Sequence, residues 1–152
     1  MSKRRTLIRA GLPVLAAFIV FAASAAGRPA EILPRDRLPD GFAVGSGAPA
    51  LGLKVTVVEG RVTASAAAPA DEANVRATRG GDAEQTVLNV RTELDVALKF
   101  DLYVSRDGQT FQYASSCAVT PGISSFEMWK YPVAAFAIGN PRVVSAKRFS
   151  CD

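Results

Sequence analysis

The segment LDVALKFDLYVSRDGQTFQY, which runs from Leu94 to Tyr113, decides the fold that this sequence predicts. In its first half, large apolar side chains occupy every second position, with small or polar residues and one tyrosine between them. The apolar set is Val96, Leu98, Phe100, Leu102 and Val104, and the other set is Ala97, Lys99, Asp101, Tyr103 and Ser105. A period of two is typical of a β-strand with one buried face, so the second set is expected to face solvent.

A turn follows this strand at Asp107-Gly108. A two-residue type I′ loop needs positive φ at both of its residues, which Gly reaches freely and Asp tolerates. Such a loop places Val104 opposite Phe111, and continuing the ladder places Leu98 opposite Cys117. The segment therefore predicts a β-hairpin in which the apolar face of the first strand continues across the second.

Further short β-rich runs flank this hairpin and are separated by turn signals. We expect strands at 51–58, 61–64, 74–78, 86–92, 123–129, 133–138 and 142–149, with a turn at Gly139-Asn140-Pro141 between the last two. No segment has a convincing helical pattern. This spacing predicts an all-β fold, a small antiparallel β-sandwich, with a small closed β-barrel as the alternative.

The N-terminus has the layout of a secretory signal peptide. Basic residues at 3–5 precede an apolar run at 11–23, and small residues follow at 24–26. Residues 1–26 are therefore expected to direct export to the periplasm or the extracellular space, by the general or the twin-arginine route. The alternative is an uncleaved anchor, in which case a membrane would be contacted through this segment alone.

The next stretch, 27–50, is rich in Pro and Gly. We expect it to be a linker without regular structure, part tether and part surface strap. The sandwich domain is expected to occupy 51–152.

Cys117 and Cys151 are the two cysteines of the chain. An even number of cysteines in an exported chain predicts a disulfide, here closing a loop of about 34 residues and stabilising the fold by about 4 kcal/mol in the chain-entropy model. The two do not form a Cys-x-x-Cys redox pair, so the bridge is expected to be structural. Two free buried thiols in a cytosolic protein would be the alternative, but the signal peptide argues against it.

Charge and composition exclude several classes of protein. The net charge is +4, but Lys3, Arg4, Arg5 and Arg9 account for all of it, so the chain from Gly27 onward is neutral. Nucleic-acid binding normally needs a basic face, and we therefore expect no nucleic-acid partner. The chain has no His, which is the commonest general base near neutral pH and the commonest metal ligand. We expect no metal and no cofactor.

Candidate catalytic groups are few. Paired carboxylates can hydrolyse sugars, and Glu93, Asp95 and Asp101 lie close together in the sequence. We interpret them as solvated surface charges, because Asp101 is expected on the outward face. The predicted register also places Lys99 opposite Ser116, on an exposed face where Lys keeps its charge and is a poor base. No catalytic residue is assigned.

Aromatic side chains are the remaining binding candidates. Exposed Trp and Tyr bind sugars or protein partners, so Trp129, Tyr131 and Tyr103 are the candidate ligand contacts, although a core Trp is the commoner fate in a sandwich. The sequence therefore predicts an exported, non-catalytic binding module whose ligand is a protein or a carbohydrate. One alternative is a secreted hydrolase that uses carboxylates. The other is a subunit of a cell-envelope or extracellular assembly, recruited through an edge strand.

Overall fold

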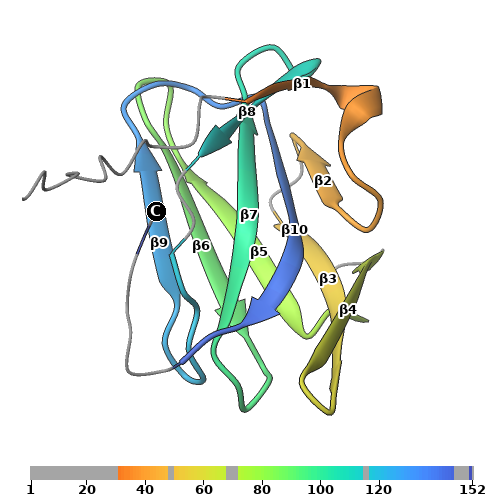
Figure 1. Cartoon of the computed structure of the whole chain (residues 1–152). Helices are drawn as coiled ribbons and strands as arrows, with labels where there is room; N and C mark the ends of the chain where they lie inside the picture. The colour runs from red at the N-terminus through yellow and green to blue at the C-terminus, as the bar shows by residue number, and fades with distance from the viewer. Residues whose placement is uncertain (1–30, 48–49, 68–71, 115–116, 146–150, 152) are drawn as a thin grey trace, which may run out of the picture.

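The computed structural model describes residues 31–47, 50–67, 72–114, 117–145 and 151, and these form two five-stranded antiparallel sheets. Sheet A has the strand order β1-β8-β7-β10-β2, and sheet B has the order β4-β3-β5-β6-β9. The elements are β1 (Ile32–Pro34), the 3-10 helix η1 (Arg35–Arg37), β2 (Ala43–Ser46), β3 (Ala50–Val58), β4 (Arg61–Ala67), β5 (Val75–Gly81), β6 (Thr86–Thr92), β7 (Leu98–Ser105), β8 (Thr110–Ala114), β9 (Ser125–Trp129) and β10 (Ala135–Val143). In Figure 1, β7 of sheet A passes in front of β5 and β6 of sheet B.

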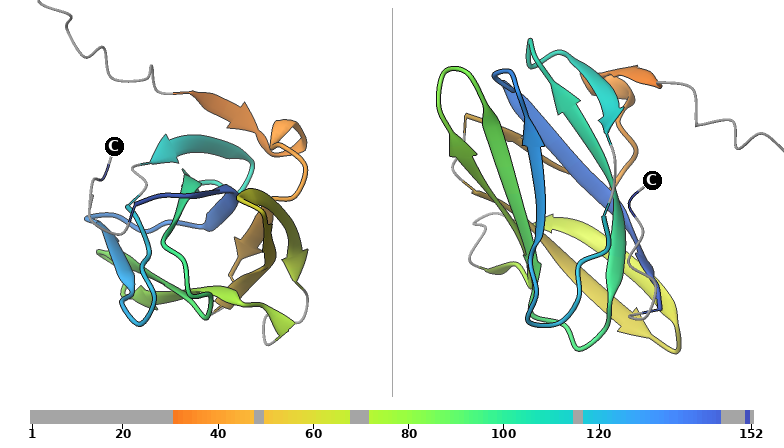
Figure 2. Two further views of the ribbon diagram at one scale, coloured as in Figure 1. Left: turned by 60° about the horizontal axis from the view of Figure 1, so that its bottom comes forward. Right: turned by 90° about the vertical axis from the view of Figure 1, so that its left-hand side faces the viewer.

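The two sheets pack face to face and are not closed into a barrel (Figures 1 and 2). The predicted β-sandwich is therefore confirmed, and the barrel alternative is wrong. Apolar side chains from both sheets meet in one core, which includes Leu53, Leu88, Phe100 and Phe136. The predicted signal peptide, 1–26, lies outside the described residues, and no described helix is long and apolar enough to cross a membrane.

β7 is the central strand of sheet A, and every residue in it is buried. Leu98 and Phe100 face the core between the sheets, as predicted, together with Leu102 and Val104. The alternate set is buried as well, so the prediction of a solvent-facing side is wrong: Asp101, for example, is 7% exposed. The outer face of sheet A must therefore have a cover of its own.

That cover includes residues 31–46, which we call the N-terminal strap. The strap contributes β1 and β2 to opposite edges of sheet A, so the expectation of irregular structure is wrong for these residues (Figure 1). Between the two edges, Leu38 and Phe42 pack on an outer cluster that includes Tyr103 and Phe111. Gly139 permits this close approach, because a Cβ at that position would collide with the ring of Phe42.

The β7–β8 hairpin differs from the predicted register by one residue. Val104 lies opposite Gln112 rather than Phe111, so an odd number of residues connects the paired positions and a two-residue loop is wrong. Beyond β8 the difference grows to two residues, because Leu98 pairs with Val119 rather than Cys117. Because of the one-residue shift Phe111 points to the outer face of sheet A, where it is fully buried under the strap.

The side chain of Asp107 explains the longer loop. Its carboxylate accepts hydrogen bonds from the backbone N–H groups of Thr110 and Gln109, each at 2.8 Å, and from the hydroxyls of Thr110 and Ser105. These donors hold the pKa of Asp107 well below its usual range. Gly108 has the expected positive φ, at 77°. The Asp-Gly pair does form the turn, but side-chain hydrogen bonds determine its length.

The last predicted turn is instead part of a strand. β10 continues through Gly139-Asn140-Pro141, and its pairing with β7 shifts between Gly139 and Arg142. An irregularity of this kind is a β-bulge, which absorbs an extra residue without ending the strand.

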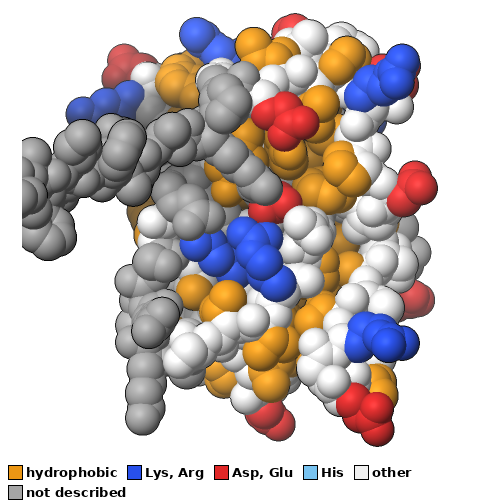
Figure 3. Space-filling model, viewed as in Figure 1, with side chains coloured by type: hydrophobic (Ala, Val, Ile, Leu, Met, Phe, Trp, Pro, Cys, Tyr) orange, Lys and Arg blue, Asp and Glu red, His pale blue; other side chains and the backbone are white. Residues whose placement is uncertain are grey.

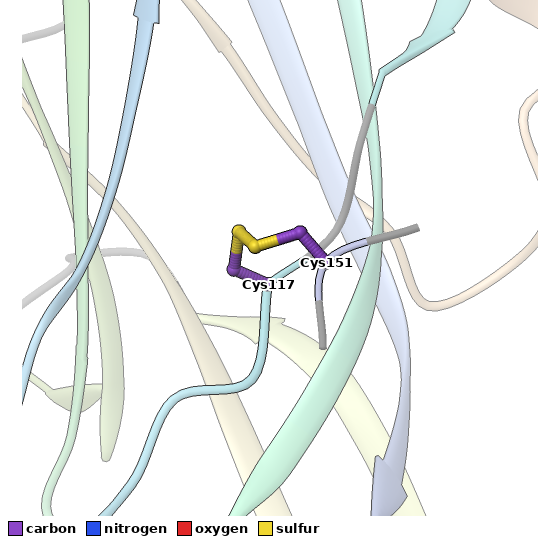
Figure 4. The surroundings of a disulfide bond; sticks show 2 residues. All are labelled: Cys117 and Cys151. Carbon is purple, nitrogen blue, oxygen red and sulfur yellow. A yellow bond between two sulfur atoms is a disulfide. The ribbon is translucent and has the colours of Figure 1, made fainter. Parts of the chain in front are cut away.

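Cys117 and Cys151 are disulfide-bonded, as predicted (Figure 4). Their Cα atoms are 4.2 Å apart, and 34 positions separate them in the sequence. The bond ties Cys151, which follows β10, to the segment that follows β8.

Candidate functional site

The three aromatic residues proposed as ligand contacts lie in two separate places. Tyr103 is buried on the outer face of sheet A, where it packs edge-on against Phe42 and Tyr113. Trp129 and Tyr131 are half-buried and pack against the core between the sheets. The structure does not bring these rings together on one surface, and their role as ligand contacts stays a prediction.

The acidic residues considered for catalysis lie in different surroundings. Glu93 and Asp95 are exposed in the connection between β6 and β7, whereas Asp101 is buried on the outer face of β7. Asp101 is therefore not the solvated charge that was predicted. Its Oδ2 accepts a hydrogen bond from Nδ2 of Asn140 at 2.7 Å, and its Oδ1 is 2.8 Å from Nη1 of Arg142. Both carboxylate oxygens thus bind side chains of the neighbouring strand β10.

The bulge in β10 creates this arrangement. It separates the pair Gly139–Asp101 from the pair Arg142–Lys99, and Asn140 within it has a φ of 49°. A bulge re-aims the side chains beside it, and here Asn140 and Arg142 both turn to Asp101. The contacts of Asp101 with Asn140 and Arg142 therefore stabilise the bulge.

Lys99 belongs to the same face and corrects a second expectation. It is 7% exposed, so the prediction that it stands on an exposed face is wrong, and its predicted partner Ser116 lies outside the described residues. Figure 3 shows basic side chains gathered near the middle of this face, with acidic ones close by. Within the described residues, no three His, Cys, Asp or Glu side chains lie close enough together to hold a metal ion.

Two hollows among the described residues are candidate small-molecule sites. A cavity of about 10 Å³ lies between the sheets beside Cys117 and Glu127, and this volume holds at most about one water molecule. A shallow hollow of about 580 Å³ beside Lys54 is bordered by Ala67 and Glu72. Those two residues flank 68–71, which lie outside the described part of the chain.

An apolar surface remains on β9, at the edge of sheet B. β9 pairs with β6, and its period of two points Glu127 and Trp129 inward while Phe126 and Met128 point outward. Phe126 is 61% exposed and Met128 is 53% exposed, although apolar side chains of this size are normally buried. We call these two residues, with exposed Ile123 just before the strand, the β9 patch.

The surroundings of the β9 patch are basic on one side. Val87 and Asn89 lie opposite Met128 and Phe126 on β6 and share the outer face with them. The next outward position on β6 is Arg91, which lies directly opposite Arg76 of β5. An apolar edge therefore adjoins two guanidinium side chains on one continuous face of sheet B.

The ligand contacts predicted from the sequence do not include Phe126, Met128, Ile123 or Arg91. A signal for the first of these was present, because a strand that buries Trp129 must turn Met128 and Phe126 to its other face.

Comparison with known proteins adds no relatives. No protein-family model matches the chain, and no curated protein or solved structure shows significant similarity to it. The fold and its surfaces therefore carry the functional argument alone.

Proposed function

We propose that this chain is an exported, non-catalytic module that binds another protein through the β9 patch. The observation that carries the proposal is the exposure of Phe126 and Met128 side by side on an edge strand. Exposed large apolar side chains that lie together mark interaction sites on soluble proteins, whereas single ones are common and need no explanation.

A protein suits this surface better than a carbohydrate. Sugar-binding faces use the flat rings of exposed Trp and Tyr, but Trp129 and Tyr103 are engaged in packing. Phe126 is the one exposed aromatic side chain within the described residues, and its neighbours Met128 and Ile123 are aliphatic. Met is flexible and is favoured at surfaces that adapt to protein partners.

Export is part of the proposal and has separate support. The N-terminal segment has the layout of a signal peptide, and the disulfide is of the kind that persists in oxidising compartments. A partner is therefore sought among proteins of the cell envelope or the medium.

The test places a photo-crosslinking amino acid at position 126 and, as the control, at position 58. Val58 is a matched control because it is 60% exposed and lies on β3, away from β9 in the strand order of sheet B. Crosslinks made in the exporting cells and identified by mass spectrometry should recur at 126 and be absent at 58. The crosslinked protein is then purified, and its affinity is measured for the unlabelled chain.

Two variants decide the outcome of that measurement. Replacing both Phe126 and Met128 by Ser should weaken binding at least tenfold, because contacts at the centre of an interface carry most of its free energy. Val58→Ser should leave the affinity unchanged. Equal affinities for the two variants would refute the proposed surface, and equal crosslinking at both positions would do the same.

A further inference from the structure

We propose that the partner adds one extended strand to the open edge of β9, and that this strand carries an acidic side chain facing Arg91. The inference rests on the proposed function, because it specifies how a partner uses the β9 patch.

β9 is an edge strand of sheet B. β9 pairs with β6 on one side, and none of the described strands pairs with its other side (Figure 2, right). Alternate residues of a strand direct their N–H and C=O groups to opposite sides, so part of the β9 backbone points away from β6. Natural sheets protect such an edge with Lys, Pro, a bulge or an inward-pointing charge. Ser125–Trp129 has no Lys, Pro or bulge, and Glu127, its one charged residue, points inward. The backbone groups on the outer edge can still pair with one more strand.

The other edge strands are less suitable. β1 has three residues and includes Pro34, and β2 has four residues and includes Gly45. β4 is longer, but it lies against β2 and β10, and a Cβ at Gly41 of the strap would be 3.0 Å from the carbonyl oxygen of Ala64. Among the described strands, β9 is therefore the edge that combines length, access and large apolar side chains.

The β9 patch favours a particular side-chain pattern in an added strand. Side chains directly opposite each other on neighbouring strands are about 5 Å apart. A strand added to β9 would place every second side chain beside Phe126 and Met128, on the outer face that Val87 extends. Apolar residues at those alternate positions would remove the exposed surface of both side chains from water.

Arg91 supplies a positive charge on the same face. It lies at the end of β6, directly opposite Arg76 of β5, and its side chain is exposed to solvent. Arg91 lies one outward position beyond Asn89, the partner of Phe126. The added strand would have one residue that contacts Phe126. A carboxylate two residues beyond it would therefore lie within reach of the long side chain of Arg91.

The test uses synthetic peptides of about nine residues, a length typical of strands. Valine occupies alternate positions, threonine lies between them, and one glutamate is placed at either end. The control peptides carry glutamine instead. Each is titrated into the isotopically labelled, disulfide-bonded protein, and amide hydrogen exchange along β9 is followed by NMR.

We expect binding to slow exchange at alternate amides of Ser125–Trp129. One of the two glutamate peptides should bind about two- to fivefold more tightly than its glutamine control at low salt, which is the range for an exposed ion pair. Arg91→Gln should abolish that difference and leave the affinity of the glutamine peptide unchanged. Replacing Phe126 and Met128 by Ser should weaken all of the peptides.

The outcomes separate this inference from the proposed function. If the serine variants lose the crosslinked partner but no peptide protects the β9 amides, the binding surface is correct and strand addition is wrong. Equal binding of glutamate and glutamine peptides refutes the acidic residue. If the protein instead pairs with itself through β9 as its concentration rises, and the peptides do not compete, the occupant is a second copy and the inference is overturned.

Discussion

The hydroxyl of Thr86 offers a sharp test of how the two sheets are joined. Thr86 lies on β6 and is 1% exposed. Its Oγ1 accepts a hydrogen bond from the backbone N–H of Val133 at 2.9 Å and donates one to the carbonyl oxygen of Tyr131 at 3.2 Å. Both partners belong to the connection that carries the chain from β9 in sheet B to β10 in sheet A. Thr86→Val keeps the shape of the side chain and removes both bonds.

The expected loss of stability follows from the two backbone groups, of Val133 and Tyr131, that Thr86→Val leaves without a partner. The bond to Val133 is buried, and an unsatisfied buried donor costs about 1–3 kcal/mol. The bond to Tyr131 is partly buried, so water can replace some of it, and its loss costs about 0.5–1.5 kcal/mol. Thr86→Val should therefore destabilise the protein by about 1.5–4.5 kcal/mol, a large part of the roughly 5–15 kcal/mol that holds an ordinary domain folded.

Urea unfolding of the disulfide-bonded protein measures this difference. Thr86→Ser keeps the hydroxyl, loses one buried methyl group and should cost about 1 kcal/mol. Thr78→Val makes the same chemical change on an exposed side chain of β5, so its effect should stay below about 0.5 kcal/mol. If Thr86→Val proved no more damaging than Thr86→Ser, the hydroxyl would not be joining the sheets, and the reasoning would fail.

Three further predictions concern turns and strand ends. The pKa of Asp107 is lowered in the folded state, so its carboxylate stabilises the fold above about pH 4, the pKa of the unfolded chain, and this contribution is lost as the pH falls further. The difference in urea midpoint between wild type and Asp107→Asn should therefore narrow from about pH 6 to about pH 2.5. Gly81→Ala should cost at least about 2 kcal/mol because φ is 111° and a Cβ would collide with the backbone of the turn, while Gly80→Ala meets nothing within 4 Å and should change thermal stability by less than about 0.5 kcal/mol. The side chain of Asn74 pairs with both the N–H and the C=O of Val55, at 2.8 and 2.7 Å, so Asn74→Asp should cost about 1–3 kcal/mol in denaturant melts, and a neutral result would show that this pairing is dispensable.

The positions of strands such as β6 were predictable from the local sequence pattern, whereas the pairing between strands was not. The run predicted at 86–92 coincides with β6, and the apolar alternation of β7 identified its inward face correctly. The hairpin register failed because the length of the loop depends on hydrogen bonds to the Asp107 carboxylate, which an Asp-Gly pair does not reveal by itself. A type I′ loop and a loop closed by an aspartate side chain share the same two residues.

Burial of the outer face could not be predicted for a different reason. The cover over Tyr103 and Phe111 comes from Leu38 and Phe42, more than sixty residues earlier in the chain. Strand periodicity shows that a side chain faces away from one core and says nothing about a second layer beyond it. The β9 patch was predictable from the sequence, because a strand that directs Trp129 into the core directs Phe126 to its other face.

The position of the N-terminal strap also has a consequence for the order in which the protein folds. Synthesis from the N-terminus delivers the strap before the strands on which it packs, which include β8 with Phe111 and β10 with Ala137. Leu38 and Phe42 therefore lack their apolar partners until nearly the whole chain has emerged. Among the described residues, those of the strap emerge first and dock last, and a chain cut short before β10 leaves Leu38 and Phe42 exposed to aggregation.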